Sequence, residues 1–267
     1  MAYSLLALGS NLGDRSGMLR RALAEVSYLP AIRLLVRSSL HETTPIGGPA
    51  GQGAFLNAAA LIWTRLAPAD LLHELRQIEK ALGRQRAEHW AARTIDLDVL
   101  LYDEAIIATA DLRIPHPRMA YRRFVLEPAA EIAGSMVHPD SGWTIDGLLS
   151  HLNQAEDVVA VAASSADETD ILLAALSRRL GLRSVSSGRH VGDQPAVLSW
   201  PNAAQASVGV RPKLLLALSS GGTDSLATRR MLHLPVTGPV AWVSDDPAQS
   251  LDEAVAAVQS VWPALAT

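Results

Sequence analysis

Two aspartates, Asp96 and Asp98, lie two residues apart in a segment whose neighbouring residues are apolar. Because successive side chains of a strand point to opposite faces, both carboxylates would share one face, and Ile95, Leu97 and Val99 would share the other. The residues that follow are apolar on both faces, so the strand belongs in an interior. Acids in an interior need a compensating cation, and the pair therefore predicts a metal site.

Cationic and aromatic residues precede the two aspartates within a stretch short enough to be a loop: Arg84, Arg86, His89, Trp90 and Arg93. Carboxylate oxygens suit magnesium, and guanidinium groups pair well with phosphate. The pattern therefore indicates a site for magnesium and a polyphosphate. The alternative is a strand with one solvated face whose acids pair with surface arginines, and the apolar run after the acids counts against it.

Composition places the chain among globular proteins. Its 267 residues are 49% hydrophobic with a net charge of -4, enough for one large domain or two modest ones. The absence of a basic block predicts that nucleic acid is not a partner, and the N-terminus lacks the features of a signal peptide or a membrane span. The lack of cysteine excludes disulfides and thiolate metal sites, and a cytoplasmic location is expected.

Apolar periodicity and turn residues predict the order strand, helix, strand, strand, helix, strand in the first half of the chain. The predicted elements are Tyr3–Leu8, Arg15–Tyr28, Ile32–Leu40, Phe55–Thr64, Pro68–Leu82 and the strand that contains Asp96. This order is the split pattern of a ferredoxin-like α+β sandwich. A loop leading into a short helix should follow Ile114, and the unit should end near Leu152.

Five motifs in a fixed order resemble the 6-hydroxymethyl-7,8-dihydropterin pyrophosphokinase family. They are ALGSNLGD at 7–14, FLNAA at 55–59, GRQR at 83–86, WAARTIDLD at 90–98, and PHPRM at 115–119 with RRF at 122–124. The resemblance covers about residues 2 to 153. It implies a three-layer ferredoxin-like sandwich and an enzyme that moves the β,γ-pyrophosphoryl group of ATP onto the pterin hydroxymethyl group, leaving AMP.

The resemblance also implies roles for individual residues. Asp96 and Asp98 would hold two Mg²⁺ ions, and Arg84 and Arg93 match the family's catalytic arginines, whose planar groups can follow charge as it moves. The residues that would line the nucleotide are Glu79, Arg86, Trp90, His116 and Arg122. The residues that would bind the pterin are Thr43, Thr44, Pro45, Ile46, Phe55, Asn57 and Phe124. Pterin and ATP would be the small-molecule partners.

Two departures from the family pattern fall in the arginine-rich loop. His89 stands where the family commonly has Arg, and Ala91-Ala92 stand where it has Gly-Pro. The first weakens one possible phosphate contact and the second alters loop stiffness. A non-catalytic pterin- or nucleotide-binding protein is the competing hypothesis, although a binding protein has no need of a costly acid pair.

Residues from about 155 onward lie outside the resemblance, which predicts domains at 1–154 and 155–267. Strands are predicted at Val158–Ala163, Lys213–Leu218 and Pro239–Val243, and helices at Ile171–Leu180 and Leu251–Trp262. Alternating strands and helices indicate a small parallel α/β domain.

Two segments of this second domain are similar to nucleotide-binding loops. Residues 158–170 have the strand-loop-helix layout of a P-loop without its Gly and Lys, and residues 219–225 resemble the loop of ATP pyrophosphatases with too little chain following. We favour a degenerate nucleoside-kinase-like domain without catalysis. A module for dimerisation or docking is the alternative.

Overall fold

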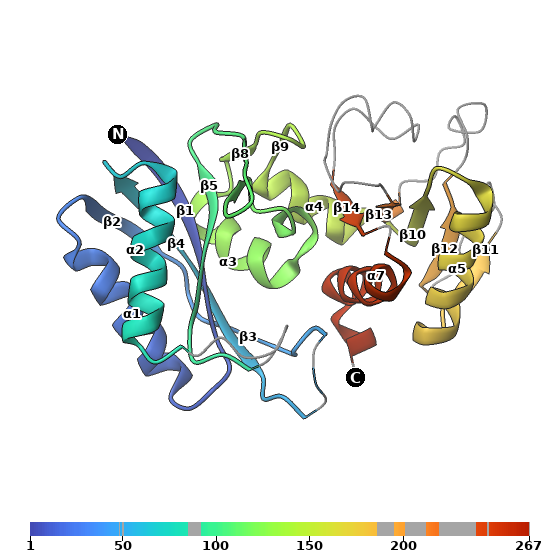
Figure 1. Ribbon diagram of the computed structural model, residues 1–267, viewed down its shortest axis with the longest axis horizontal. Coiled ribbons are helices and arrows are strands. Elements are labelled where there is room, and N and C mark those ends of the chain that lie inside the picture. Colours follow the sequence, from blue (N-terminus) through green and yellow to red (C-terminus); the bar gives the residue numbers. More distant parts are fainter. Residues whose placement is uncertain are drawn as a thin grey trace. The chain divides into compact units, whose positions relative to one another are not determined.

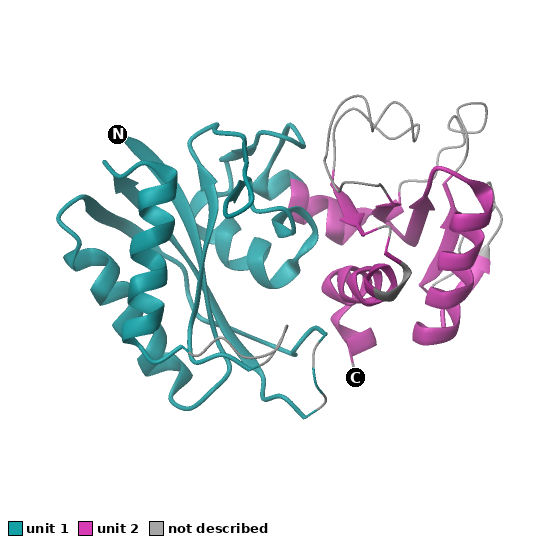
Figure 2. Ribbon diagram, in the orientation of Figure 1, with its two compact units in different colours: residues 1–147 teal, residues 148–267 magenta. Residues whose placement is uncertain are grey.

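The computed structural model describes residues 1–47, 49, 51–84, 92–185, 195–200, 212–218, 239–244 and 246–266. The chain divides into two compact units, Met1–Gly147 and Leu148–Thr267 (Figure 2). The division lies inside helix α4 (Ile145–Gln154), a few residues before the boundary predicted near Ala155.

The first unit is built on an antiparallel sheet with the strand order β2-β4-β1-β5, and β3 pairs with β4 (Figure 1). The strands are β1 (Ala2–Ser10), β2 (Ile32–Arg37), β3 (His41–Thr43), β4 (Phe55–Thr64) and β5 (Asp96–Tyr102). The predicted strands are present, and β2 ends three residues before the predicted Leu40. The short β3 was not predicted, because three residues are too few to show an alternating pattern.

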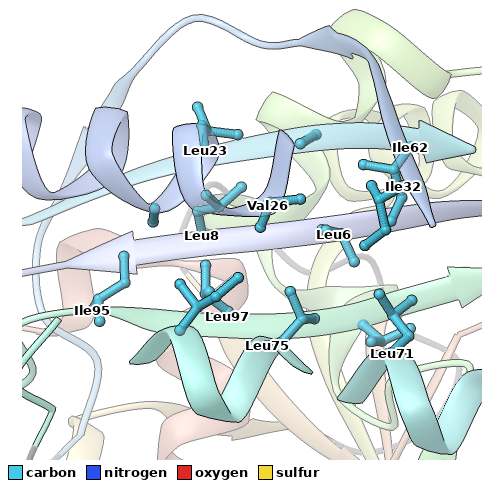
Figure 3. Packing of buried hydrophobic residues seen from close by; sticks show 14 of the residues in the cluster. Leu6, Leu8, Leu23, Val26, Ile32, Ile62, Leu71, Leu75, Ile95 and Leu97 are labelled. Carbon is cyan, nitrogen blue, oxygen red and sulfur yellow. The ribbon is translucent and has the colours of Figure 1, made fainter. Parts of the chain in front are cut away.

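Helices α1 (Arg15–Tyr28) and α2 (Pro68–Ala81) cover one face of this sheet (Figure 1). The side chain of Asp14 accepts a hydrogen bond from Gly17 N and so caps α1. Leucines of β1 and α2 interdigitate in the layer between sheet and helices (Figure 3). Apolar side chains dominate this layer, and the buried Glu79 of α2, which accepts the Leu97 backbone N–H, is a polar exception.

Helix α3 (Arg123–Ala133) packs on the opposite face, mainly against β4 (Figure 1). Its Glu131 carboxylate accepts hydrogen bonds from Ser39 N at 2.8 Å and Ser39 Oγ at 2.7 Å, and lies 2.6 Å from His41 Nε2. These contacts fasten α3 to the segment between β2 and β3 and to the first residue of β3. The remaining elements are β6 (Ile107–Ala108), β7 (Arg113–Ile114), the 3-10 helix η1 (Met119–Tyr121), β8 (Val137–His138) and β9 (Trp143–Thr144).

The second unit contains a sheet whose neighbouring strands are all parallel, in the order β11-β12-β10-β13-β14. Its elements are β10 (Glu156–Ala162), α5 (Ala166–Leu180), β11 (Arg183–Val185), β12 (Ala196–Ser199), β13 (Pro212–Leu218), β14 (Val240–Val243), α7 (Pro247–Val261) and the 3-10 helix η2 (Pro263–Ala266). The parallel α/β prediction is confirmed for these residues. In the described ranges, none of the helices has the length and hydropathy needed to cross a membrane.

Helix α5 begins five residues before the predicted Ile171, because Ser165 and Glu168 form a capping box. At the amino ends of β10 and β13, the Lys213 ammonium pairs with the Asp157 carboxylate. Trp262 Nε1 donates to the same Asp157 oxygen at 3.1 Å, and the ammonium lies 5.3 Å from the Trp262 ring centroid. This cluster ties the end of α7 to the sheet.

Candidate active site

The register of the first sheet brings the predicted polar residues to one face. Gly9 on β1 lies opposite Asn57 on β4 and opposite Asp96 on β5, and Ala7 lies opposite Asp98. Directly opposed residues of an antiparallel pair point to the same face. Because Leu97 and Val99 lie in the layer under α1 and α2, Asp96 and Asp98 point to the other face, as the alternation predicts.

The pterin residues predicted on β3 and β4 share this face. Thr43 lies opposite Phe55, and Asn57 Nδ2 donates to Thr43 Oγ1 at 2.7 Å. A Cβ atom added to Gly9 would lie 3.2 Å from Asn57 Oδ1 and 3.9 Å from the Phe55 ring. Gly9 therefore leaves room for the amide and the ring beside the acidic strand. Sequence reasoning missed this role, although a glycine inside an apolar strand signals close approach.

Asp96 is held between two arginines. Arg84 Nη1 lies 2.6 Å from Asp96 Oδ1, and Arg93 Nη1 lies 2.5 Å from Asp96 Oδ2. The side chains of Arg84, Arg93 and Asp96 are 18%, 30% and 21% exposed, respectively, so each is partly accessible to solvent. The structure therefore assembles both predicted arginines around the first aspartate.

Glu79, near the end of α2, is turned into the protein. Its Oε1 accepts the Leu97 backbone N–H at 2.7 Å and pairs with Arg84. Burial raises the pKa of Glu79, against the opposing effects of the Leu97 N–H and Arg84. Burial alone would lower the pKa of Arg84, but Asp96 and Glu79 raise it above its ordinary value. Glu79 thus orients Arg84 and β5, and its contact with nucleotide stays a prediction.

Asp98 has a pKa raised to about 7, first by burial and then by the charge of Asp96, while Arg122 opposes the shift. The Asp98 side chain is nevertheless 43% exposed, so a ligand can reach its carboxyl group even though many protein atoms surround it. Two carboxylates on one face form a hard-oxygen donor set that fits Mg²⁺. Among the described residues, no group of three or more His, Cys, Asp or Glu side chains is placed to hold a metal ion.

His116 is kept neutral beside these acids. Burial, followed by the charges of Arg122 and Arg118, lowers the pKa of His116 to about 3. Its Nδ1 accepts the Arg118 backbone N–H at 3.2 Å, and its Nε2 lies 3.9 Å from Asp98 Oδ2. With Nδ1 acting as an acceptor, a neutral ring carries its proton on Nε2, on the side of Asp98.

Arg122 brings a buried positive charge to the same region. Burial lowers the pKa of its guanidinium. The guanidinium carbon lies 5.3 Å from the centroid of the Phe124 ring. Its Nε is buried and makes no hydrogen bond with any residue of the described ranges. A buried donor without an acceptor is costly, so a bound ligand that accepts from Nε would be favoured.

Other predicted residues are placed less fully. Thr44 is exposed, and Pro45 and Ile46 are half-buried, in the segment that follows β3. Arg86 and Trp90 lie at 85–91, outside the described residues, as does the departure at His89. The roles predicted for these residues stay predictions.

Comparison with known proteins gives the family. The model of 7,8-dihydro-6-hydroxymethylpterin-pyrophosphokinase (HPPK) matches residues 5–134. The 2-amino-4-hydroxy-6-hydroxymethyldihydropteridine pyrophosphokinase of Bacillus subtilis is 48% identical over 127 residues, which are 48% of this chain and 75% of that protein. The enzyme of the same name from Haemophilus influenzae is 43% identical over 141 residues, covering 53% of this chain and 88% of that protein.

A crystal structure of Plasmodium falciparum HPPK-DHPS A437G with pteroate matches with a TM-score of 0.45 and 10% identity, over 82% of this chain and 64% of that chain. The two sequence relatives carry the assignment, since they are far more similar and most of their length is covered. The matched residues include both aspartates, their arginines and the polar face of β4. The chain therefore belongs to the 7,8-dihydro-6-hydroxymethylpterin-pyrophosphokinase family.

Proposed function

We propose that the first unit transfers the pyrophosphoryl group of ATP to the hydroxymethyl group of 6-hydroxymethyl-7,8-dihydropterin, giving AMP, as a step of folate biosynthesis. The relatives are named for this activity. The observation that carries the proposal is the gathering of the carboxylates of Asp96 and Asp98, two arginines and the amide of Asn57 on one sheet face. Such a face suits a charged polyphosphate beside a flat heterocycle with hydrogen-bonding edges.

In this proposal the hydroxymethyl oxygen attacks the β-phosphorus in line, the bond from that phosphorus to the oxygen bridging it to the α-phosphorus breaks, and the hydroxyl proton passes to solvent. Asp96 and Asp98 would hold two Mg²⁺ ions, which when bound neutralise phosphate charge and polarise the hydroxyl group. Arg84 and Arg93 each have donors beyond those given to Asp96, and these would bind oxygens on which charge develops.

For the pterin, we propose that Asn57 reads the polar edge of the ring and that Phe55 and Phe124 pack against its faces. Thr43 supports this by fixing the Asn57 amide through the 2.7 Å hydrogen bond. Thr44, Pro45 and Ile46 would close the pocket from the segment after β3. For the nucleotide, Glu79, Arg86, Trp90, His116 and Arg122 are the proposed lining.

We also propose that the first unit is a ferredoxin-like three-layer sandwich, which its strand order and antiparallel directions support. The second unit, with a predicted boundary near 154/155, is proposed to be a degenerate nucleoside-kinase-like domain without catalysis, and dimerisation or docking is its alternative role. Its parallel sheet and strand-loop-helix order support the first reading. A cytoplasmic location stays a prediction.

The test is release of AMP from ATP, measured in a coupled assay with the full chain. AMP should form only when both Mg²⁺ and hydroxymethyl-dihydropterin are present. A binding protein that has lost turnover is the competing function. It would bind pterin and nucleotide in calorimetry without forming AMP, and that result would contradict the proposal.

A further inference from the structure

We infer that Asn11 is a positioning residue that couples the pterin side of the site to Arg93. The inference rests on the proposed function. It assigns a role to a residue whose hydrogen bonds go to Arg93, Gln52 and Gly53 and not to the carboxylates of Asp96 and Asp98. Asn11 follows the end of β1 directly and is 5% exposed. Its backbone and its amide side chain contact two segments that are far apart in the sequence.

The first contact is with the backbone of Arg93. Asn11 Oδ1 accepts the Arg93 N–H at 2.7 Å, and the Asn11 N–H donates to the Arg93 carbonyl at 3.1 Å. Ser10 Oγ donates to the next carbonyl, that of Thr94, at 2.6 Å. These bonds fix the main chain from which the Arg93 guanidinium extends to Asp96. They limit where that guanidinium can lie when a phosphate arrives.

The second contact is with the segment that leads into β4. Asn11 Nδ2 lies 3.2 Å from Gln52 Oε1 and 3.5 Å from the Gly53 carbonyl oxygen, to which it donates. Arg15 Nη1 donates to the next carbonyl, that of Ala54, at 2.7 Å. Residue 54 is followed directly by Phe55, so the same amide that fixes Arg93 also fixes the approach to the pterin residues.

The coupling follows from the two ends of one amide. Its oxygen serves the Arg93 segment and its nitrogen serves Gln52 and Gly53, so the group cannot turn over without losing both sets of bonds. A pterin that settles the segment before Phe55 would therefore also settle the Arg93 backbone. Two sites linked in this way must affect each other's affinity reciprocally.

The experiment compares the wild type with Asn11→Ala, Asn11→Asp and Ser4→Ala. Asn11→Asp keeps an acceptor for the Arg93 N–H and removes the donor to Gln52. Ser4→Ala is the matched structural control. The buried Ser4 Oγ of β1 donates to the Leu101 carbonyl of β5 at 2.9 Å, away from the site, so this variant also loses a hydrogen bond between the β1 and β5 regions of the chain. For each protein, kcat, both KM values, the melting temperature, and pterin Kd with and without a Mg²⁺-bound non-hydrolysable ATP analogue are measured.

We expect Asn11→Ala to lower kcat at least about tenfold with the KM for ATP changed less than about threefold, because a misplaced arginine acts on the transition state. The ratio of the two pterin Kd values should move toward one. Asn11→Asp should lose the same coupling while keeping kcat within about threefold of the wild type. Ser4→Ala should change the melting temperature, and it should leave both kcat and the ratio of the two pterin Kd values unchanged.

An active wild type whose coupling and kcat survive in Asn11→Ala would overturn the inference and leave the proposed function intact. Equal loss of kcat in Asn11→Ala and Ser4→Ala would also overturn it, because the effect would then be one of general stability. A wild type that forms no AMP would contradict the proposed function itself, and the role of Asn11 with it.

Discussion

Each unit has a place that its sequence associates with phosphate, and the two places differ in how their polar groups are satisfied. At the start of α5, Ser165 Oγ accepts the Glu168 N–H and the Glu168 carboxylate accepts the Ser165 N–H, both at 3.2 Å. Asp167 adds a second acid to that first turn. In the first unit, Asp98 on the sheet has a raised pKa, and the nearby Arg122 Nε makes no hydrogen bond with any of the described residues.

The comparison shows that a sequence pattern typical of phosphate binding is not enough by itself. The structure must also present polar or charged groups whose hydrogen-bonding capacity or charge is not already satisfied within the protein. The start of α5 has its backbone N–H groups capped by its own side chains and carries acids, so it repels an anion. On the face around Asp96 and Asp98, the two carboxylates repel each other, and a bound cation would reduce that repulsion. The second unit also has an ion pair, between Lys213 and Asp157. The Asp157 carboxylate of this pair also accepts the indole N–H of Trp262, so its hydrogen bonds are made within the same unit.

The largest expected effect is on turnover and concerns the acids. Asp96→Ala or Asp98→Ala should reduce AMP formation by at least about a hundredfold, because each removes a major charge-stabilising group. The matched control is Asp157→Ala, an acid of the second unit, which should leave turnover unchanged. Steady-state kinetics of the three variants test this. Turnover within about threefold of wild type in both active-site variants would contradict the metal assignment.

The second effect is on pterin affinity. Phe124→Ala should weaken pterin binding by about 1–3 kcal/mol if the ring stacks on the ligand, and should weaken binding of an ATP analogue less. Trp262→Phe, which changes an aromatic residue of the second unit, should bind both ligands like the wild type. Calorimetry with each ligand separates the cases. Equal losses for both ligands in Phe124→Ala would mean that the ring serves only the core.

The third effect is on stability of the second unit. Lys213→Met should lower the free energy of unfolding by about 1 kcal/mol, because it removes an ion pair whose carboxylate is 39% exposed and keeps the Trp262 Nε1–H. AMP formation should not change. Urea unfolding followed by circular dichroism measures the loss, with the exposed Lys80→Met as control. A loss of turnover in folded Lys213→Met would show that the two units are functionally linked.

A smaller, pH-dependent effect is expected at the contact of α3. The hydrogen bonds from Ser39 lower the pKa of Glu131 below its ordinary value of 4.5. A depressed carboxyl pKa gives stability that is present above the unfolded value and is lost as pH falls through the folded value. Glu131→Gln should therefore be less stable than wild type at pH 7, with the difference shrinking below pH 4.5. Melting temperatures between pH 7 and pH 3 test the sign.

A small effect on turnover is expected from removing the part of the second unit that follows α4. A chain ending at Gln154 retains α4 and every residue of the proposed site, so its kcat should stay within about threefold of the full chain. Kinetics and melting curves of both proteins check this. A folded shortened chain without turnover would show that the second unit contributes to the site.

Local patterns were enough to predict several elements. The bounds of α1 and β4 agree with the predicted Arg15–Tyr28 and Phe55–Thr64, because the Asp14 cap and the apolar runs act over a few residues. The common face of Asp96 and Asp98 follows from the two-residue period of a strand. Strands β11 and β12 were not predicted, although β14, which is no longer than β12, was.

Non-local pairing decided what the sequence did not reveal. Helical spacing places Glu79 on α2 but does not show that its carboxylate reaches across to the Leu97 N–H. The position of Gly9 between Asn57 and Asp96 depends on the register of three strands. Such contacts are set by how separate segments pack, and a window of neighbouring residues does not contain that information.

The register around Gly9 also determines which changes in length the first unit can tolerate. One residue inserted in the middle of β1 would shift its pairing with β4 and β5, and Gly9 would no longer lie opposite Asn57 and Asp96. A deletion in β5 would turn Asp96 toward the leucines under α2. We therefore expect relatives that diverge by insertion and deletion to vary in the connecting segments and to keep the lengths of these three strands.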